Sequence, residues 1–301
     1  MVLSAEFKQS AFDQNPKSSE DLTQEKIKQY HEDGFLIVRN FFQPEEIDPL
    51  LRSLTTHAKE YASGEIRALD NTGKPYSIIY WTELGDSLLG VFPRVARMVE
   101  GAETLLGESC YHWHSKVCRK LPNSGQVEWH QDYGSWYHDG CLSPQLISCA
   151  IAIEPCTPEN GCLQILKGSH VLGRMDVIKM GNTVGADPQR LQIAMEKMEI
   201  VNCVMAPGDA VFFHSNVLHG SPPNHSDRSR AMMFCTYNAI SNQPFILEGQ
   251  EHHRYRPLQK LPNSAIIEGN YHSAMEDKAE VYKPNPELDR PFMNIPPFAE
   301  K

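Results

Sequence analysis

The chain has 301 residues, of which 41% are hydrophobic and 22% charged, and its formal net charge is −10. This composition predicts a packed globular core. The negative charge argues against nucleic acid or an anionic membrane as a partner, because binding phosphate groups needs a cationic surface. No run of 18 apolar residues occurs, which argues against a membrane-spanning helix.

The start of the chain and its cysteines both bear on its location. The first residues, MVLSAEFKQS, show no basic segment followed by an apolar one, so we expect no secretory signal. The eight cysteines form no CxxC pair, and most stand in apolar or strand-like runs. We therefore expect buried, reduced thiols in a cytoplasmic protein and no zinc–cysteine cluster.

The N-terminal part predicts a leader followed by a helix. Residues 1–21 are polar and carry no apolar period, which predicts a flexible leader. A helix is predicted from Leu22 to Gly34, because its apolar residues stand at roughly helical spacing. Asp21 or Thr23 can cap its start, and glycine is usual just after a helix end.

The next segments predict a strand, a second helix and then a β-rich region. FLIV at 35–38 is a short apolar strand, and a helix begins at Pro44, where a proline and two acids suit the first turn. From about residue 76, short β-rich runs alternate with turn residues, which predicts a sandwich or jelly roll. The runs are SIIYW, YHWHSKVCRKL, QLISCAIAIE, CLQIL, EIVNCVMA, DAVFFH and RAMMFCTYNA.

Two segments allow more than one interpretation. Residues 191–200 suit either a short helix or the approach to a strand. The segment from Gln250 is rich in proline, asparagine, histidine and acids. It either wraps the surface, covers the mouth of a site or is disordered.

Three residues have the pattern of a metal site. His130 and Asp132 are separated by one residue, and residues i and i+2 of a strand point to the same face, so both can reach one ion. His219 stands between the apolar strand DAVFFHS and a turn, which places a third ligand on a different strand. Two histidines and one carboxylate hold a ferrous ion on one face and leave its other positions open.

An arginine follows the third candidate ligand. GSPPNHSDRS is interpreted as a hairpin loop that brings Arg230 back on the strand beside His219. A guanidinium there can bind a carboxylate through two parallel hydrogen bonds, so we expect it to anchor an oxidising co-substrate with a carboxylate tail. We interpret Arg228 as a solvated loop charge.

Four segments, in this order, resemble the phytanoyl-CoA dioxygenase family of iron(II)- and 2-oxoglutarate-dependent oxygenases. They are DGFLIVRNFFQPEEI (33–47), WHQD (129–132), PENGCLQILKGSH (158–170) and GDAVFFHSNVLHGSPPNHSDRSR (208–230). The resemblance covers roughly residues 22 to 245, with Lys167 where a proline is common. Within the family, EWHQDYGSWYHDGCLSP (128–144) and TYNAISNQPF (236–245) are similar to ectoine hydroxylases. Cys118 and His114 stand where those enzymes have an asparagine and a glutamine.

The resemblance implies a mainly β fold with flanking helices (α+β) and a double-stranded β-helix core of the jelly-roll or cupin-like type. It implies one oxygenase domain over residues 22–249, after the leader at 1–21, and a C-terminal extension over 250–301. His130, Asp132 and His219 are expected to hold iron(II), as the metal ligands and catalytic centre. The other residues that it implies are Arg230 and Ser221 for the distal carboxylate of 2-oxoglutarate, Lys116 and Cys118 for the co-substrate pocket, and Trp136, Phe234 and His114 for the substrate.

The expected activity is oxidation of a small metabolite, an amino-acid-like compound or a natural-product intermediate. It uses iron(II), 2-oxoglutarate and O2 and releases succinate and CO2, with hydroxylation as the main expected outcome. Asp132 argues against halogenation, because a halogenase of this type replaces the carboxylate with a small residue. The sequence indicates no oligomeric state.

Three alternatives stay open. The first is a regulatory protein that binds metal and a 2-oxo acid without turnover. The second is a zinc hydrolase, against which Arg230 and the lack of an HExxH motif weigh. The third is a structural jelly roll with incidental histidines.

Overall fold

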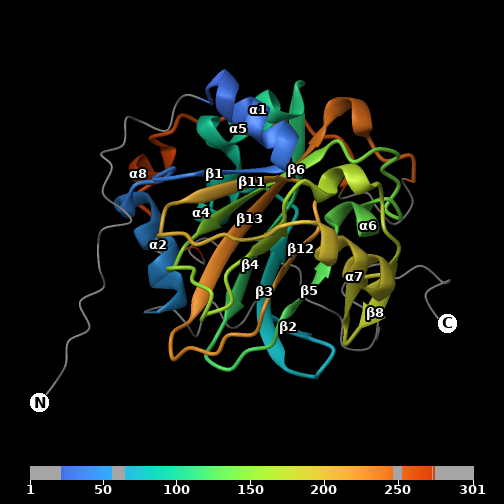
Figure 1. Ribbon diagram of the computed structural model, residues 1–301. Coiled ribbons are helices and arrows are strands. Elements are labelled where there is room, and N and C mark those ends of the chain that lie inside the picture. The colour runs from blue at the N-terminus through green and yellow to red at the C-terminus, as the bar shows by residue number, and fades with distance from the viewer. Residues whose placement is uncertain (1–21, 56–64, 247–252, 273, 275–301) are drawn as a thin grey trace, which may run out of the picture.

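Two antiparallel sheets form the centre of the computed structural model, which describes residues 22–55, 65–246, 253–272 and 274 (Figure 1). The larger sheet has seven strands in the spatial order β1 (Phe35–Val38), β11 (Ala210–His214), β6 (Leu146–Ala152), β13 (Arg230–Ala239), β4 (Cys110–Lys120), β3 (Pro75–Trp81) and β2 (Ile66–Leu69). The smaller sheet has four, in the order β10 (Ile200–Asn202), β7 (Gln164–Leu166), β12 (His219–Ser221) and β5 (Val127–His130). A separate hairpin joins β8 (Val177–Met180) to β9 (Thr183–Ala186). Each predicted β-rich run contains one of these strands.

The helices lie outside the sheets. They are α1 (Gln24–Asp33), α2 (Pro44–Leu54), α4 (Leu88–Val91), α5 (Ala96–Leu106), α6 (Asp132–Trp136), α7 (Pro188–Lys197) and α8 (Ala265–Glu268), with 3-10 turns η2 (Phe92–Arg94), η3 (Ser169–Leu172) and η4 (Ile240–Asn242). No helix in these described ranges is long and apolar enough to cross a bilayer.

The predicted helix boundaries are confirmed by their caps. The hydroxyl of Thr23 accepts a hydrogen bond from the backbone N–H of Lys26 at the start of α1, and Gly34 ends the helix with φ +81°. Helix α2 begins at Pro44, as predicted. Residues 191–200 combine both interpretations, because α7 covers most of them and β10 begins at Ile200. The expected leader at 1–21, with its alternative cap Asp21, lies outside the described residues.

Alternating residues of the larger sheet separate two apolar cores. On β13, Met233, Cys235 and Tyr237 face outward into a core that they share with the helices, including Leu105 of α5. Met232 and Phe234 face inward into a second core between the two sheets. This double layer confirms the predicted jelly roll, and it assigns polar residues at the inward positions to the space between the sheets.

The eight cysteines are all free and buried, as expected from their apolar surroundings. Burial raises the pKa of the Cys110 and Cys141 thiols to about 12 and keeps both protonated. These thiols therefore act as small apolar groups in the cores.

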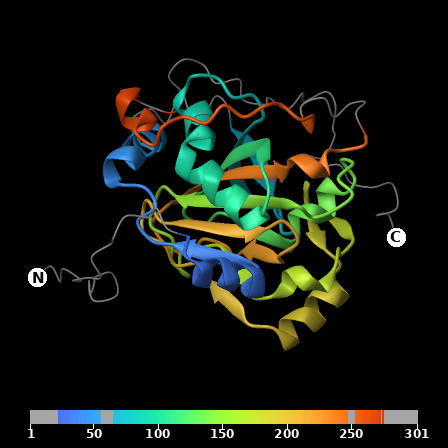
Figure 2. The ribbon, with the colours of Figure 1, turned by 90° about the horizontal axis from the view of Figure 1, so that it is seen from above.

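The described part of the C-terminal extension crosses the molecule over α5 and ends beside α2 (Figure 2). Its course is fixed by backbone pairing, since the N–H of Ala96 donates to the carbonyl of Leu261 and the N–H of Leu261 donates to that of Arg94. Helix α8 then packs against α2 and α4. Residues 247–252, 273 and 275–301 are outside the described ranges.

Candidate active site

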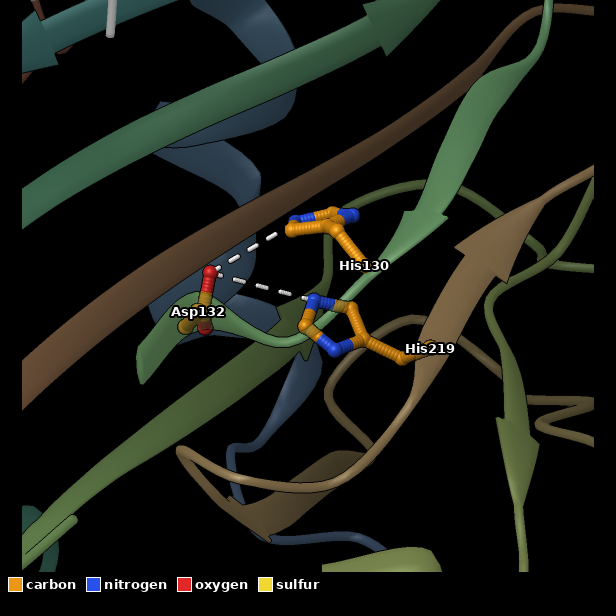
Figure 3. A group of neighbouring side chains, drawn as sticks. All are labelled: His130, Asp132 and His219. Carbon is orange, nitrogen blue, oxygen red and sulfur yellow. Dashed lines mark ion pairs between the residues drawn. The ribbon is translucent and has the colours of Figure 1, made fainter. Parts of the chain in front are cut away.

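Three side chains converge between the sheets (Figure 3). The Nε2 atoms of His130 and His219 lie 3.6 and 3.9 Å from Oδ1 of Asp132, and the three candidate ligand atoms are all within 4.8 Å of one another. All three residues are buried. They form the one group of three or more His, Cys, Asp or Glu residues within the described ranges that has the spacing of a metal site.

The elements that carry these ligands differ in part from the prediction. His130 ends β5 and His219 begins β12, and the two are direct partners across the antiparallel pair. The prediction that His219 lies on a different strand from His130 is therefore confirmed. The prediction that Asp132 shares a strand with His130 is wrong, because Asp132 is the first residue of α6.

Gln131 makes the turn between strand and helix, and its buried side chain points away from the ligands. Its amide nitrogen donates to the carbonyls of Gly173 and Asn216, at 2.9 and 2.8 Å, and its amide oxygen accepts from the N–H of Met175 at 2.7 Å. These three bonds hold the turn, and the turn directs the carboxylate of Asp132 back towards both imidazoles.

Each imidazole is oriented by a backbone carbonyl two residues earlier. Nδ1 of His130 lies 2.7 Å from the carbonyl oxygen of Glu128, and Nδ1 of His219 lies 3.0 Å from that of Val217. A carbonyl only accepts, so each Nδ1 carries the hydrogen and each Nε2 keeps its lone pair. This is the tautomer that a metal ligand needs, and such a bond to the other ring nitrogen is usual at metal sites.

The charge states also suit a cation. Burial on its own would raise the pKa of Asp132, but the neighbouring His219, Lys116 and His130 outweigh it and lower this pKa well below its usual value. Burial and the nearby His130 lower the pKa of His219 to about 3, although Asp132 opposes this. An ionised carboxylate and a neutral imidazole are therefore present at neutral pH. Two imidazole nitrogens and one carboxylate are the donor set of a non-haem iron(II) centre, so these residues fit iron.

Arg230 lies on the inner face of the larger sheet, but the predicted hairpin is wrong. Strand β12 belongs to the smaller sheet and β13 to the larger, so the loop between them crosses from one sheet to the other. The guanidinium reaches back across this space to the hydroxyl of Ser221 and to the carbonyl of Gly161, which lies 2.6 Å from one of its terminal nitrogens. Arg230 and Ser221 are thus brought together through the space between the layers.

Sequence reasoning missed Lys120, which is fully buried beside Arg230 and directly opposite it in register. Its ammonium donates to the hydroxyl of Ser221 at 2.6 Å and to the carbonyls of Ser221 and Pro222 at 3.0 and 2.6 Å. Burial, and then the charge of Arg230, hold its pKa well below the usual value. The one signal in the sequence was alternation, because Lys120 shares a strand face with the predicted residues Lys116 and Cys118.

Neither of these two buried cations forms an ion pair with an acid in the ranges that the structure describes. Both donate to the same hydroxyl of Ser221 instead, and that hydroxyl donates to the carbonyl of Gly161. Buried charges are usually paired, so two adjacent basic side chains that contact only neutral oxygens indicate a place for an anion.

The predicted co-substrate residues lie between this cationic pair and the metal ligands. Cys118, two residues before Lys120, is opposite Met232, and Lys116, two residues earlier again, is opposite Phe234. The Nζ atom of Lys116 is 5.4 Å from the ring centroid of Phe234, and its charge contributes to the lowered pKa of Asp132.

The predicted substrate residues lie at two places: Phe234 is opposite Lys116, whereas His114 and Trp136 lie further from the Arg230–Lys120 pair. Trp136 stands one helical turn after Asp132 on α6, and its ring is 5.5 Å from that of His114. Phe234 is linked to the ligands through Phe213, whose ring is 6.4 Å from that of Phe234 and 4.8 Å from that of His219. All of these predicted residues therefore border one inter-sheet space.

Comparison with known proteins gives a consistent result. The sequence profile of the family described as "Phytanoyl-CoA dioxygenase (PhyH)" matches residues 30–232. An ectoine dioxygenase from Bordetella bronchiseptica is 28% identical over 246 residues, covering 75% of this chain and 78% of that protein. An L-proline trans-4-hydroxylase from Streptomyces griseoviridis is 30% identical over 176 residues, covering 53% of this chain and 66% of that protein.

Solved structures show the same fold. The crystal structure of EctD from S. alaskensis with bound Fe superposes with a TM-score of 0.67 at 20% identity, covering 83% of this chain and 90% of that chain. The structure of the same protein with 2-oxoglutarate and 5-hydroxyectoine gives a TM-score of 0.65 over the same shares. The double-stranded β-helix predicted from the sequence is confirmed.

Proposed function

Because this chain belongs to the phytanoyl-CoA dioxygenase family of iron(II)- and 2-oxoglutarate-dependent oxygenases, we propose that it hydroxylates or otherwise oxidises a small, amino-acid-like metabolite or natural-product intermediate. The observation that carries the proposal is the arrangement of side chains in the space between the two sheets. His130, Asp132 and His219 converge there from the smaller sheet and α6, and the Arg230–Lys120 pair lies on the facing strands β13 and β4 of the larger sheet. We also propose that residues 22–249 form the oxygenase domain and that residues 250–301 are a C-terminal extension, whose described residues 253–272 and 274 pack on the domain. The cytoplasmic location stays a prediction.

The residues have distinct proposed tasks. His130, Asp132 and His219 would hold iron(II), which, when bound, activates O2 so that 2-oxoglutarate leaves as succinate and CO2 and one oxygen atom enters the product. Arg230 would bind the distal carboxylate of 2-oxoglutarate, with the Ser221 hydroxyl beside it. Retention of the Asp132 carboxylate favours hydroxylation over halogenation.

The substrate end supports a compact molecule. His114, Trp136 and Phe234 are all buried, so a substrate that contacts them must enter the interior of the protein, which favours a small compound over a long one. Relatives named for ectoine and L-proline support a small cyclic amino-acid-like substrate. We therefore expect no need for the cationic surface that an acyl-CoA would require.

The test begins without oxygen. Protein with iron(II) and 2-oxoglutarate should develop a weak visible charge-transfer band, and admitting O2 with a substrate panel that includes ectoine and L-proline should give substrate-stimulated succinate. The His219→Ala variant should lose both signals, whereas His225→Ala, at an exposed loop position, should keep them. A band without stimulated succinate would favour the regulatory alternative. Activity with zinc and without iron would favour a hydrolase.

A further inference from the structure

We propose that His253, supplied by the C-terminal extension, is a substrate-specificity residue of the oxygenase site. The proposal rests on the oxygenase function proposed above and assigns one more residue to its substrate end. The segment that carries His253 lies beyond residues 30–232, the part that the family profile matches.

His253 is buried against the predicted substrate residues although it is far from them in sequence. Its ring stacks on the indole of Trp113, with centroids 3.7 Å apart and planes 8° from parallel. Its ring centroid is 6.3 Å from that of His114. The backbone is held as well, because the hydroxyl of Tyr111 donates to the carbonyl of His253 at 3.1 Å.

A β-bulge explains why two neighbouring residues of β4 turn their rings to the same place. His114 pairs with Thr236, whereas the register with β13 then skips Trp113. The extra residue lets both rings approach Trp136, at centroid distances of 6.2 Å for Trp113 and 5.5 Å for His114. His253 therefore joins a group of rings that already surrounds the indole predicted to wall the substrate.

This group lies on the side of the metal ligands that is away from Arg230. The row of Thr236 and His114 also includes Ser148, whose hydroxyl is 2.9 Å from that of Thr236 and 3.5 Å from Oδ2 of Asp132. The row of Arg230 is six positions away along β13. If the co-substrate spans from Arg230 to the iron, the rings near His253 face the remaining side, where a substrate must lie.

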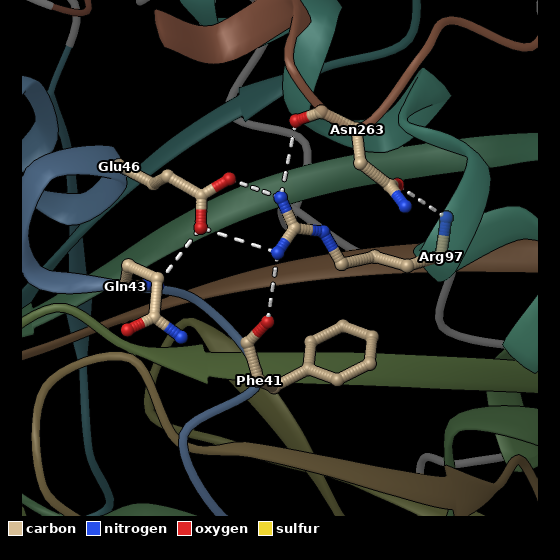
Figure 4. Close-up of polar contacts among 5 residues, drawn as sticks. All are labelled: Phe41, Gln43, Glu46, Arg97 and Asn263. Carbon is tan, nitrogen blue, oxygen red and sulfur yellow. Dashed lines mark hydrogen bonds and ion pairs between the residues drawn. The ribbon is translucent and has the colours of Figure 1, made fainter. Parts of the chain in front are cut away.

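An ion-paired network anchors the extension at Asn263, ten residues after His253 (Figure 4). The guanidinium of Arg97 on α5 bonds the carboxylate of Glu46 on α2 and donates to the carbonyl of Asn263 at 3.1 Å. The backbone N–H of Arg97 donates to the side-chain oxygen of Asn263 at 2.9 Å. Anchoring the segment in this way lowers the entropy cost of holding His253 in one place, which a recognition residue requires.

The chemistry of the group indicates what it recognises. An imidazole offers a flat face and nitrogens that donate or accept, and here two of them, His114 and His253, stand among indole rings. This combination suits a compact cyclic substrate that carries a hydrogen-bonding group. Trp113 fixes the plane of the His253 ring and thereby the position of the ring nitrogens. Substrates are therefore selected by the position of the hydrogen-bonding group that they carry.

The test separates recognition from folding. His253→Phe keeps a flat ring for stacking on Trp113 but removes both nitrogens, and Arg254→Ala changes the exposed neighbour as a matched control. Affinities of the anaerobic iron(II)–2-oxoglutarate protein for ectoine and for L-proline are read from the perturbation of the charge-transfer band. Loss of one buried hydrogen bond predicts a change of about tenfold in the affinity for at least one probe or in their ratio. The affinity for 2-oxoglutarate should change by less than about twofold, which is much smaller than the change expected for the probe.

Two results would overturn the proposal. One is a His253→Phe protein with both probe affinities unchanged, and the other is equal weakening of probes and 2-oxoglutarate, which indicates a merely structural role. If neither probe binds the wild-type protein, the substrate is neither of these two cyclic compounds and the affinity test cannot be applied. Histidine-labelled protein loaded with cobalt(II) then decides alone, because paramagnetic shifts at His253 relative to the zinc(II) form support its place at the site and unshifted signals refute it.

Discussion

At the scale of single residues, the two ligand imidazoles are held by hydrogen bonds to residues that are near in the sequence. The Arg230–Lys120 pair is held by hydrogen bonds to residues that are far away in the sequence. Each imidazole is oriented by a carbonyl two residues earlier, so its ring plane depends on its own strand end. Arg230 and Lys120 instead share the hydroxyl of Ser221 in the opposite sheet. The geometry of the Arg230–Lys120 pair therefore depends on how the two sheets pack.

Replacing Arg230 with alanine should weaken 2-oxoglutarate use while leaving the metal group in place. Each charge-assisted bond contributes about 1.5–3 kcal/mol, which corresponds to a rise in the 2-oxoglutarate KM of roughly tenfold to a hundredfold. Initial rates of succinate formation against 2-oxoglutarate concentration measure this. Arg228→Ala, on the exposed part of the same loop, is the control. Equal KM values in the two variants would refute the anchor role.

Replacing Lys120 with methionine keeps an apolar stem of similar length and removes the ammonium. The Ser221 hydroxyl then loses the donor that holds it 2.6 Å from Nζ, so we expect a higher 2-oxoglutarate KM and an unchanged charge-transfer band at saturating 2-oxoglutarate. Titration of the band measures both. An unchanged KM would show that Lys120 acts only in folding.

At the scale of elements, the structure of the loop before β7 explains the sequence PENG at residues 158–161. Asn160 closes the loop, since its side chain accepts from the N–H of Thr157 and donates to the carbonyl of Pro155. Gly161 follows with φ +76°, a left-handed conformation that favours glycine. Its carbonyl is thereby directed at Arg230 and Ser221. The motif thus supplies an acceptor that orients the anchoring guanidinium.

Gly161→Ala should lower both stability and 2-oxoglutarate affinity. An added Cβ would lie 2.4 Å from the carbonyl oxygen of Pro222, and a left-handed non-glycine residue costs about 1–3 kcal/mol in addition. Gly107→Ala, after helix α5, is the matched control, because its φ is +77° and nothing lies within 4 Å of the added Cβ. Urea unfolding and the 2-oxoglutarate KM measure the two effects. Identical losses in both variants would show that backbone strain alone is responsible.

At the scale of the whole molecule, the outer core and the inter-sheet space have different roles. The outer core stabilises the fold, and the inter-sheet space holds the candidate site. Helices α1, α2 and α5 cover the outer face of the larger sheet, and the C-terminal extension crosses over α5 (Figure 2). The space between the two sheets holds the candidate ligands, the Arg230–Lys120 pair and the ring of His114. Stability and activity are therefore expected to respond to different substitutions.

The pH dependence of stability is a whole-molecule property. Burial, with smaller effects of His170 and His31, lowers the pKa of His214 to about 4, and burial lowers that of His112 to about 3. The unfolded chain binds these protons near pH 6.5, so between about pH 6.5 and 4 it holds more protons than the folded protein. The free energy of unfolding should fall as the pH falls through this window, by at most about 1.4 kcal/mol per pH unit for each histidine. Partial solvent exposure of both rings reduces this value.

Urea unfolding between pH 7 and pH 4 measures the effect. His214→Gln should flatten the slope by up to one proton, whereas His225→Gln, at an exposed position, should leave it unchanged. A slope that His214→Gln does not alter would assign the acid sensitivity to other groups.

The sequence alone determined the helix caps, the strands, the jelly roll and the residue types of the candidate centre. These properties depend on periodicity, on glycine and proline positions and on ligand chemistry, which are local. Only the tertiary structure decided that Asp132 opens a helix, that Arg230 reaches across to the other sheet, that Lys120 lies beside Arg230 on the same Ser221 hydroxyl, and that His253 stacks on Trp113. The reason is physical, because these relations arise from packing between segments far apart in the chain, and neither spacing nor alternation encodes which distant side chains meet.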